Sequence, residues 1–424
     1  MNQHTMSNRV YGRVRTGMYG VSSRLGLADL PFQIYVMLAL GLLFSFGRNL
    51  AFPYLAMYLT GKSASGGLEM DPSLVGFMLM VGGFASILAL LFTGSLCDRF
   101  GRRKMMLLFV VPQVVLTAGY AYANLFTEFL VLYAVMSVLG AFYDPAHSAM
   151  VADLVQPGRR EEVYGLSYMI SNIGVVISPP IGGVIASSSG YPILFVYTAV
   201  LLAVGAVIVF VLIKESYSQI DRPSSVTLAQ LGGVFRDRLF VLFCLFAALT
   251  SVVYTQLYGL LSVYTEYVGL PPYAFGMLFS VNGAMVVALQ IPIRKAAMKI
   301  GSTKTFVIAQ LLFAVGFTYF LVSRDFFQFL VGVVVLTLGE ITFMPASSGF
   351  IANLSPVDMR GRYMALSGLF YGIGGSVGTM IGFRLYGVLP NKEFIWAVLG
   401  AVGFATLPGY LYLLKAHRKT QTSS

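Results

Sequence analysis

Long apolar stretches alternate with short polar connections along most of the chain. A helix needs about 20 mostly apolar residues to cross the hydrocarbon core of a bilayer. Twelve segments meet this requirement: 33–59, 74–97, 105–124, 127–151, 163–187, 191–213, 239–264, 273–293, 304–322, 326–351, 363–389 and 394–414. The pattern predicts an all-α membrane protein of twelve transmembrane helices.

The longer polar segment 214–238 divides the predicted spans into two groups of six. We therefore expect five parts: a cytoplasmic N-terminal tail (1–32), a first six-helix half (33–213), a cytoplasmic linker (214–238), a second six-helix half (239–414) and a cytoplasmic C-terminal tail (415–424). The N-terminal tail is basic and lacks a short apolar run with a small-residue cleavage site, so we expect no cleaved signal peptide.

Composition and charge agree with this interpretation. Of the 424 residues, 57% are hydrophobic and 11% are charged, whereas soluble domains carry about 25% charged residues. With the N-terminus assigned to the cytoplasm, 23 of the 28 Lys and Arg residues fall in connections on that side and three, Lys62, Arg324 and Lys392, fall on the other. Cytoplasmic loops carry such an excess. The net charge of +11 thus predicts a multi-pass protein of the cell membrane with both termini cytoplasmic, and needs no nucleic-acid partner.

Enzymatic and metal-binding functions find little support. The two cysteines, Cys97 and Cys244, lie in apolar segments, and two of the three histidines lie in the tails. Neither a disulfide framework nor a paired metal site is expected from such spacing. No phosphate-binding loop is present in the sequence. We expect no enzyme activity and no cofactor, and an ion gradient as the energy source.

An internal repeat appears at an offset of 200 residues. It matches Gly and Pro positions in both halves: Pro72 with Pro272, Gly76 with Gly276, Gly83 with Gly283, Gly101 with Gly301, Pro145 with Pro345, Gly174 with Gly374 and Gly182 with Gly382. Two six-helix halves of the same orientation imply an axis along the membrane normal. This arrangement suits alternating access, with substrate held between the halves.

The strongest local motif lies between the second and third predicted spans. It reads Gly94-Ser-Leu-Cys-Asp98-Arg99-Phe-Gly101-Arg102-Arg103-Lys104. This segment resembles the loop signature of the major facilitator superfamily, and the resemblance extends over the whole chain. It implies the major facilitator fold and a cytoplasmic gate.

In such a gate, Asp98 can face the positive start of a neighbouring helix. Either Arg99 or Arg102 can pair with Asp153, at the cytoplasmic end of span 4. In the resembled family such contacts hold the cytoplasmic side closed and break for inward opening. The alternative is that these charges only enforce topology. The second copy, Lys299 to Lys304, lacks the Asp and Arg, so one latch should dominate.

A second motif lies in span 5. Gly174, Ser178, Pro179, Gly182 and Gly183 resemble the family's antiporter signature, with Ser178 at a position that usually holds glycine. In the family this element marks exporters. Proline kinks a helix and glycines allow close helix packing, so an ordinary kinked helix is the alternative.

Span 4 departs from the drug-exporter pattern. Drug exporters of the resembled family often carry an arginine in this span, four residues before a glycine. When this sequence is aligned on Gly140, that position holds Met136. The coupling mechanism of that branch therefore does not carry over simply.

Three ionisable residues lie well inside spans: Arg48, Asp144 and Glu340. Each is costly in a bilayer, by roughly 2.5–3.5 kcal/mol or more at its centre, so each should face the protein interior or a wet cavity. In the resembled fold, spans 1, 4, 7 and 10 line the central cavity, which implies that all three lie on the substrate path. Arg48 can pair with Asp144, whereas Glu340 has no evident basic partner and is the better proton carrier. The alternative is a structural ion pair and a satisfied interhelical hydrogen bond.

Two pairs of tyrosines repeat across the halves. Tyr54 and Tyr58 in span 1 match Tyr254 and Tyr258 in span 7. Their rings are candidate contacts for a lipophilic or cationic substrate. Packing, or a belt at the membrane interface, is the slightly favoured alternative.

We conclude that the sequence is typical of a secondary active transporter that functions as a monomer. Proton-coupled efflux of small amphipathic or drug-like molecules is the leading interpretation, since span 5 resembles the antiporter signature and the spans keep buried acids. The alternatives are an uptake or facilitative permease for a metabolite such as a sugar or organic ion, and a non-transporting membrane receptor or scaffold.

Overall fold

A computed structural model of the protein describes residues 30–63, 66–216, 234–356 and 359–422. The described residues form helices and short connections, without a β-strand. Most of the expected N-terminal tail and most of the linker 214–238 lie outside them.

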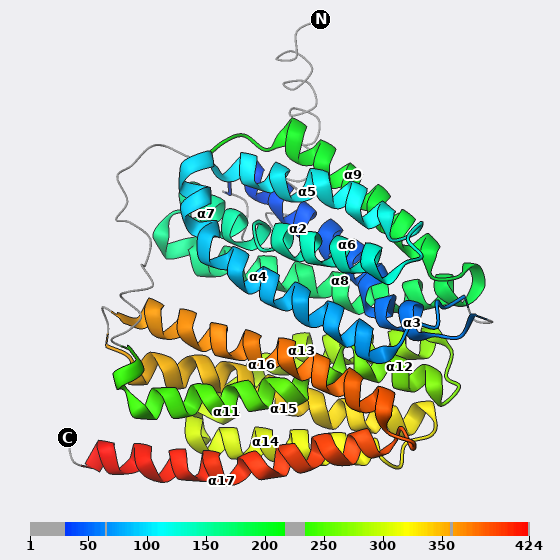
Figure 1. Cartoon of the computed structure of the whole chain (residues 1–424). Helices are drawn as coiled ribbons and strands as arrows, with labels where there is room; N and C mark the ends of the chain where they lie inside the picture. Colours follow the sequence, from blue (N-terminus) through cyan, green and yellow to red (C-terminus); the bar gives the residue numbers. More distant parts are fainter. Residues whose placement is uncertain (1–29, 64–65, 217–233, 357–358, 423–424) are drawn as a thin grey trace, which may run out of the picture.

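The first half occupies the upper part of Figure 1. Its helices are α2 (Phe32–Ala51), η2 (Phe52–Tyr54), α3 (Leu55–Thr60), α4 (Pro72–Phe100), α5 (Arg102–Gly119), α6 (Phe126–Gly140), α7 (Tyr143–Leu154), η4 (Pro157–Arg159), α8 (Arg160–Ser189) and α9 (Pro192–Leu212).

The second half lies below the first. Its helices are η5 (Val234–Arg236), α11 (Arg238–Tyr254), η6 (Thr255–Leu257), α12 (Leu260–Tyr267), α13 (Pro272–Ile300), α14 (Ser302–Tyr319), α15 (Phe326–Leu354), α16 (Arg360–Val388) and α17 (Phe394–Thr422). Helix α17 continues beyond residue 414, into the range expected to be a tail.

Ten helical segments of the described chain are long and apolar enough to cross a membrane. They coincide with ten of the predicted spans. The remaining two, 105–124 and 304–322, correspond to α5 and α14. Helix α5 begins with Arg102, Arg103 and Lys104, and the apolar part of α14 is the shorter segment Lys304–Tyr319. The three charged residues of its first turn explain why α5 stands apart.

Local chemistry fixes several helix ends. Asp71, Asp237 and Asp325 each accept a hydrogen bond from a backbone N–H in the first turn of α4, α11 and α15, at 2.6, 3.0 and 3.0 Å. A side-chain oxygen at this position satisfies a donor that the helix leaves unpaired. Gly101 and Gly301 end α4 and α13 with φ of 88° and 92°, a conformation that glycine adopts at little cost.

Three predicted spans are interrupted in the middle of the bundle. Span 1 passes from α2 through η2 to α3, span 7 from α11 through η6 to α12, and span 4 from α6 to α7. In span 4 the break precedes Pro145, which has no N–H to donate to the carbonyl of Ala141. Tyr54, Asp144 and Tyr258 lie at or next to these interruptions, so the local change in backbone conformation affects where their side chains point.

The halves join through two helix pairs, α4 with α16 and α8 with α13. The 200-residue offset relates α4 to α13 and α8 to α16, since Pro72 and Pro272 begin one pair of helices and Arg160 and Arg360 the other. The two contacts are therefore equivalent under the repeat: α4 of the first half packs on α16 of the second, and α13 of the second half packs on α8 of the first.

These contacts are tight near one end of the bundle only. There α3 packs against α12 (Figure 1), and a Cβ added at Gly183 would lie 2.8 Å from the carbonyl oxygen of Pro272. At the other end, which carries the basic segments 98–104 and 294–304, most residues of α13 from 291 to 300 are exposed around the whole helix. We call this the basic end and the first the opposite end. The halves are therefore in contact at the opposite end and separated at the basic end.

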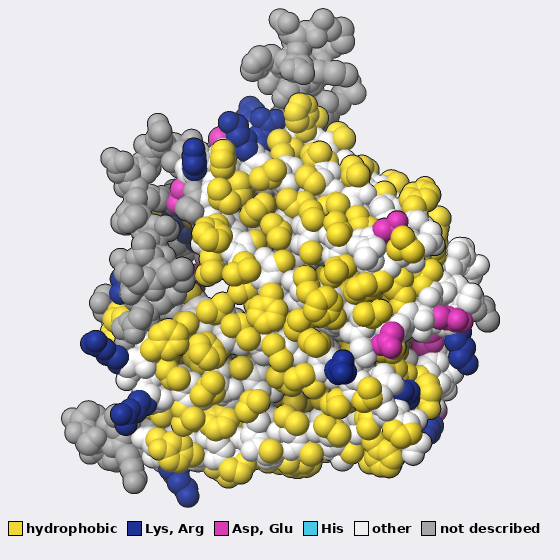
Figure 2. Space-filling model, viewed as in Figure 1, with side chains coloured by type: hydrophobic (Ala, Val, Ile, Leu, Met, Phe, Trp, Pro, Cys, Tyr) yellow, Lys and Arg dark blue, Asp and Glu magenta, His cyan; other side chains and the backbone are white. Residues whose placement is uncertain are grey.

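The outer surface fits a lipid environment. Figure 2 shows hydrophobic side chains over the middle of both halves, with Lys and Arg along the left edge and a second group of charged side chains, both basic and acidic, toward the right edge. Large exposed apolar residues include Leu90, Phe92, Val115, Val184 and Val207. Such a surface is expected where lipid is the solvent.

Candidate functional site

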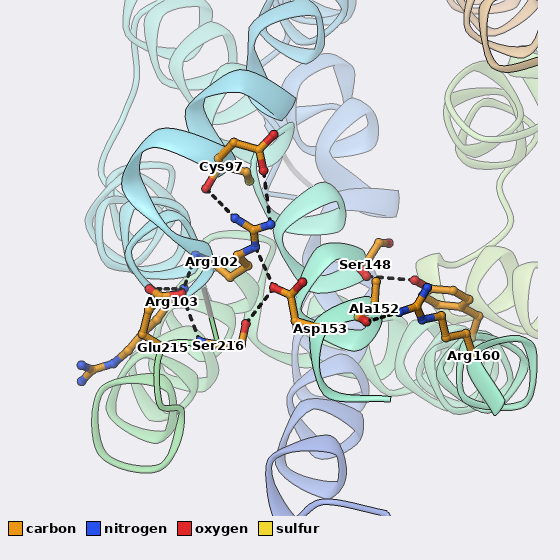
Figure 3. Close-up of polar contacts among 11 residues, drawn as sticks. Cys97, Arg102, Arg103, Ser148, Ala152, Asp153, Arg160, Glu215 and Ser216 are labelled. Atoms are coloured by element: carbon orange, nitrogen blue, oxygen red, sulfur yellow. Dashed lines mark hydrogen bonds and ion pairs between the residues drawn. The ribbon is translucent and has the colours of Figure 1, made fainter. Parts of the chain in front are cut away.

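Arg102 forms the centre of an ion cluster at the basic end. Its guanidinium group lies 3.2 Å from Asp98 Oδ1 and 3.0 Å from Asp153 Oδ2, and it donates a hydrogen bond of 3.2 Å to the carbonyl of Cys97 (Figure 3). Arg102 is 1% exposed, whereas the Asp98 side chain is 54% exposed. The buried guanidinium therefore joins α4, α5 and α7.

The start of the linker completes this cluster. The carboxylate of Glu215 accepts hydrogen bonds from the backbone N–H groups of Arg102 and Arg103, at 2.9 and 3.2 Å. Ser216 donates to Asp153 Oδ2 at 3.2 Å (Figure 3). A carboxylate at a helix N-terminus is stabilised by the helix dipole. Sequence reasoning misses Glu215 and Ser216, because no motif spacing connects the linker to the loop.

The other basic residues of the motif lie around this cluster. Arg103 donates to the carbonyl of Phe210 at 2.6 Å, and the Arg99 guanidinium lies 5.6 Å from the ring centroid of Phe100. Lys104 is exposed and Gly94 lies in the last turns of α4. Arg102, not Arg99, is thus the residue that pairs with Asp153.

All of these ion pairs lie within the first half. They are formed in a structure whose halves are separated at the basic end, so breaking them is not required for that separation. The contacts of Arg102 are thus formed while the halves are separated at the basic end, and the Asp98 side chain stays largely exposed there.

The glycines of the span 5 motif lie where α8 meets its neighbours. Cβ atoms at Gly174 and Gly182 would contact α2 at Ser45 and Leu50, and one at Gly183 would contact Pro272 and Tyr273 of the second half. Ser178 is buried and donates to the carbonyl of Gly174 at 2.7 Å. The motif thus allows close packing of α8 on both sides.

The two prolines of this motif change the hydrogen bonding of α8. Because Pro180 has no N–H, the carbonyl of Val176 loses its partner within the helix. Ser280 of α13 donates a hydrogen bond to this carbonyl. The Tyr54 hydroxyl donates to the carbonyl of Pro179. Both bonds use backbone groups of α8, and the first joins the two halves.

Glu340 lies in the middle of α15 and is half-buried. Its Oε2 accepts a hydrogen bond of 2.8 Å from the amide of Asn282 on α13, and its Oε1 lies 3.5 Å from the Tyr258 hydroxyl. The amide of Asn282 also donates to Thr337 Oγ1 at 2.9 Å. Among the described residues, no Lys, Arg or His forms an ion pair with Glu340.

Aromatic side chains surround this carboxyl group. The hydroxyls of Tyr254 and Tyr258 are 2.5 Å apart, and Tyr371 of α16 and Tyr168 of α8 lie within electrostatic range of Glu340. Residues from four helices in both halves thus converge on one acid. Such a group can exchange a proton and can attract a cation to aromatic faces.

The equivalent tyrosines of the first half have different surroundings. Tyr54 packs edge-on against Phe275, and Tyr58 packs among Phe129, Tyr191 and Phe195 with ring centroids 5.8–5.9 Å apart. Both are almost completely buried. This environment favours the packing interpretation for Tyr54 and Tyr58, whereas Tyr254 and Tyr258 adjoin the acid.

Arg48 and Asp144 are both exposed, and the described residues contain no ion pair between them. The Arg48 guanidinium interacts electrostatically with Tyr133 of α6. Asp144 lies in the first turn of α7, near Tyr143 and His147. The predicted Arg48–Asp144 pair is thus not formed in this structure, because exposed charges need no partner to offset desolvation. Met136, at the position expected for an exporter arginine, is buried in α6.

The sequence matches the Major Facilitator Superfamily over residues 37–288 and 255–424. It is 28% identical over 400 residues to a Na(+), Li(+), K(+)/H(+) antiporter of Planococcus maritimus, covering 87% of this chain and 92% of that protein. It is 27% identical over 389 residues to the multidrug resistance protein MdtH of Photorhabdus laumondii subsp. laumondii, covering 88% and 92%.

Solved structures share the fold. A peptide transporter POT in complex with sulfate superimposes with a TM-score of 0.77 at 17% identity, covering 92% of this chain and 95% of that one. A mutant of the nucleoside transporter NupG gives a TM-score of 0.75 at 11% identity, covering 90% and 99%. The match to the family over residues 37–424 shows that the protein is a membrane transporter that belongs to the major facilitator superfamily.

Proposed function

We propose that the protein exports small amphipathic or drug-like molecules in exchange for protons, by alternating access. The observation that carries this proposal is the position of Glu340. It is a half-buried carboxyl group in the middle of a membrane helix, held by Asn282 and without a cationic partner among the described residues. A charge in such a place is costly, so a proton or a cationic substrate can each neutralise it.

The exchange follows from competition for this carboxylate. When the opposite end is open, Glu340 takes up a proton. The halves then rock to the arrangement seen here, and the proton leaves through the basic end as a substrate binds against Tyr254, Tyr258, Tyr371 and Tyr168. Cation–π contacts with such rings contribute about 0.5–2 kcal/mol each. Release at the opposite end completes the cycle.

The proposal includes an orientation. The basic end faces the cytoplasm, and both termini lie on that side. The protein crosses the cell membrane twelve times and functions as a monomer. The excess of Lys and Arg in the connections at this end supports this orientation. The present structure then faces inward, with its outer end closed by α3, α12 and the contact of Gly183 with Pro272.

The ion cluster at Arg102 serves as the cytoplasmic latch in this proposal. Helix α16 begins at Arg360 at the same end, and its N-terminus carries a partial positive charge. The exposed oxygen of Asp98 approaches this N-terminus when the basic end closes. Arg102, Asp153 and Glu215 hold Asp98 and the start of α5 in position throughout.

Exchange of an alkali cation for protons is a second candidate, favoured by the name of the Planococcus maritimus relative. Glu340, Thr337 and Tyr258 offer the oxygen atoms that such a cation requires. Uptake of a metabolite and a receptor role without transport are distinguished from both candidates by the same transport assay.

One assay separates these functions. Purified protein in proteoliposomes is given an imposed pH gradient and a panel of cationic dyes, antibiotics, sugars, Na⁺ and K⁺. The proposal expects accumulation of an amphipathic compound that collapses when a protonophore removes the gradient. Movement of Na⁺ or K⁺ alone favours the second candidate, gradient-independent sugar movement favours a permease, and no movement of any solute contradicts transport.

A further inference from the structure

The segment of α13 from Ser280 to Gly283 contacts both the acid and the interface between the halves. On one side Asn282 donates hydrogen bonds to Glu340 and Thr337 of α15. On the other, Ser280 donates to the Val176 carbonyl of α8, and a Cβ at Gly283 would lie 3.2 Å from Val175 and Val176. Side chains two positions apart on a helix point about 200° apart, so one turn of α13 connects α15 to α8.

The acceptor on α8 is available because of the prolines. In a regular helix the Val176 carbonyl would bond the N–H of residue 180, but Pro180 has none. The carbonyl therefore needs another donor, and in this structure the donor comes from the opposite half of the protein. An unsatisfied carbonyl is costly in lipid and in the protein interior.

We propose that Ser280 and Asn282 are positioning residues that couple the proton on Glu340 to the contact between α13 and α8. This inference rests on the proposed role of Glu340 as the proton carrier. A carboxylate is a stronger acceptor than a neutral carboxyl group, so protonation weakens the bond from Asn282. The turn that carries Asn282 then shifts against α15, and Ser280, two residues away, shifts with it against Val176.

The titratable groups that face Glu340 do not supply this link themselves. They are Tyr254 of α11, Tyr258 next to η6, Tyr371 of α16 and Tyr168 of α8. None of them carries a hydrogen bond to the Val176 carbonyl in the described structure. The connection from Glu340 to the Val176 carbonyl, which Pro180 leaves without a partner in its own helix, thus runs through α13.

A double-mutant cycle tests the coupling. Ser280→Ala removes the donor, Pro180→Ala restores a donor within α8, and the double variant combines them. Spin labels at Tyr122 and Val322, both exposed near the opposite end, report how far the halves separate there as the pH changes. Ser280→Thr keeps a hydroxyl, and Ser187→Ala, whose hydroxyl bonds the Gly183 carbonyl of its own helix, is the matched control.

We expect Ser280→Ala to reduce the pH-dependent change in distance at least threefold, and Ser280→Thr to restore it. In the Pro180→Ala background, Ser280→Ala should add no further change, because the carbonyl is already satisfied. Glu340→Gln should abolish the pH response and Ser187→Ala should leave it intact. A normal response in Ser280→Ala, with the response lost in Glu340→Gln, overturns this inference alone. A response that survives in Glu340→Gln overturns the proposed function as well.

Discussion

The side-chain amide of Asn282 lies 2.8 Å from the carboxylate of Glu340, although 58 residues separate them along the chain. Asn282 is 4% exposed and its amide also bonds Thr337. It therefore holds the carboxyl group of Glu340 in one orientation between α13 and α15.

Asn282→Ala should move the pH at which transport is half-maximal. A hydrogen bond to a charged group is worth about 1.5–3 kcal/mol, and 1.36 kcal/mol corresponds to one pH unit. Without the amide the carboxylate form loses support, so we expect the profile to move to higher pH by about one to two units. Initial rates in proteoliposomes over a range of pH measure this shift.

Asn124→Ala is the control for this shift, because the Asn124 amide bonds only the Tyr122 carbonyl in an exposed connection. We expect its profile to match that of the wild type. An unshifted profile in Asn282→Ala would mean that the amide does not support the charged acid.

The ion cluster at the basic end should contribute strongly to stability. Asp153→Ala leaves the buried Arg102 without one of its two acids, and breaking a buried pair costs about 3–5 kcal/mol. We expect a clear fall in the midpoint of thermal unfolding in detergent. Glu162→Gln disrupts the more exposed pair with Arg159 and should change the midpoint little, since such pairs contribute about 0–1 kcal/mol. Equal effects of the two variants would contradict the role of Arg102.

Glu215 should stabilise the first turn of α5. Its carboxylate accepts the N–H groups of Arg102 and Arg103, an interaction worth about 0.3–1 kcal/mol or somewhat more where it is partly buried. Glu215→Gln should increase hydrogen exchange in residues 102–105 severalfold. Exchange in α14, which begins at the repeat-equivalent position Ser302, is the internal reference, and unchanged exchange in α5 would exclude the capping role.

Gly183 should control closure of the opposite end. A methyl group there would overlap the backbone of Pro272 and Tyr273, whereas one at Gly165 on the same helix has no atom within 4 Å. Gly183→Ala should lengthen the distance between spin labels at Tyr122 and Val322, and shorten that between labels at Leu108 and Ile308 near the basic end. Gly165→Ala should leave both distances unchanged, and the same result in Gly183→Ala would show that the contact does not hold the end closed.

The fold was largely predictable from the chain because lipid imposes a simple rule on helix length and composition. Helix α5 satisfies the rule less well than the other predicted spans, because it begins with Arg102, Arg103 and Lys104. The Arg102–Asp153 pair was predictable in part, because the end of span 4 offers the acid while the loop motif offers two arginines, Arg99 and Arg102, and only the structure selects Arg102.

The surroundings of Glu340 were not predictable in the same way. Asn282 is one polar residue in a long helix, and no spacing rule connects it to an acid on another helix. The repeat even suggests equal roles for Tyr58 and Tyr258, yet the position equivalent to Glu340 in the first half is Gly140. Without an acid there, Tyr58 packs among aromatic rings, while Tyr258 adjoins a carboxyl group.

The central claim is that Glu340 gives up a proton when substrate binds. It is tested most directly by measuring proton release from purified protein in weakly buffered detergent solution, on addition of a compound that the proteoliposome assay identifies. We predict release of about one proton per bound substrate in the wild type and none in Glu340→Gln that still folds. Equal proton release by both proteins would show that another group carries the proton.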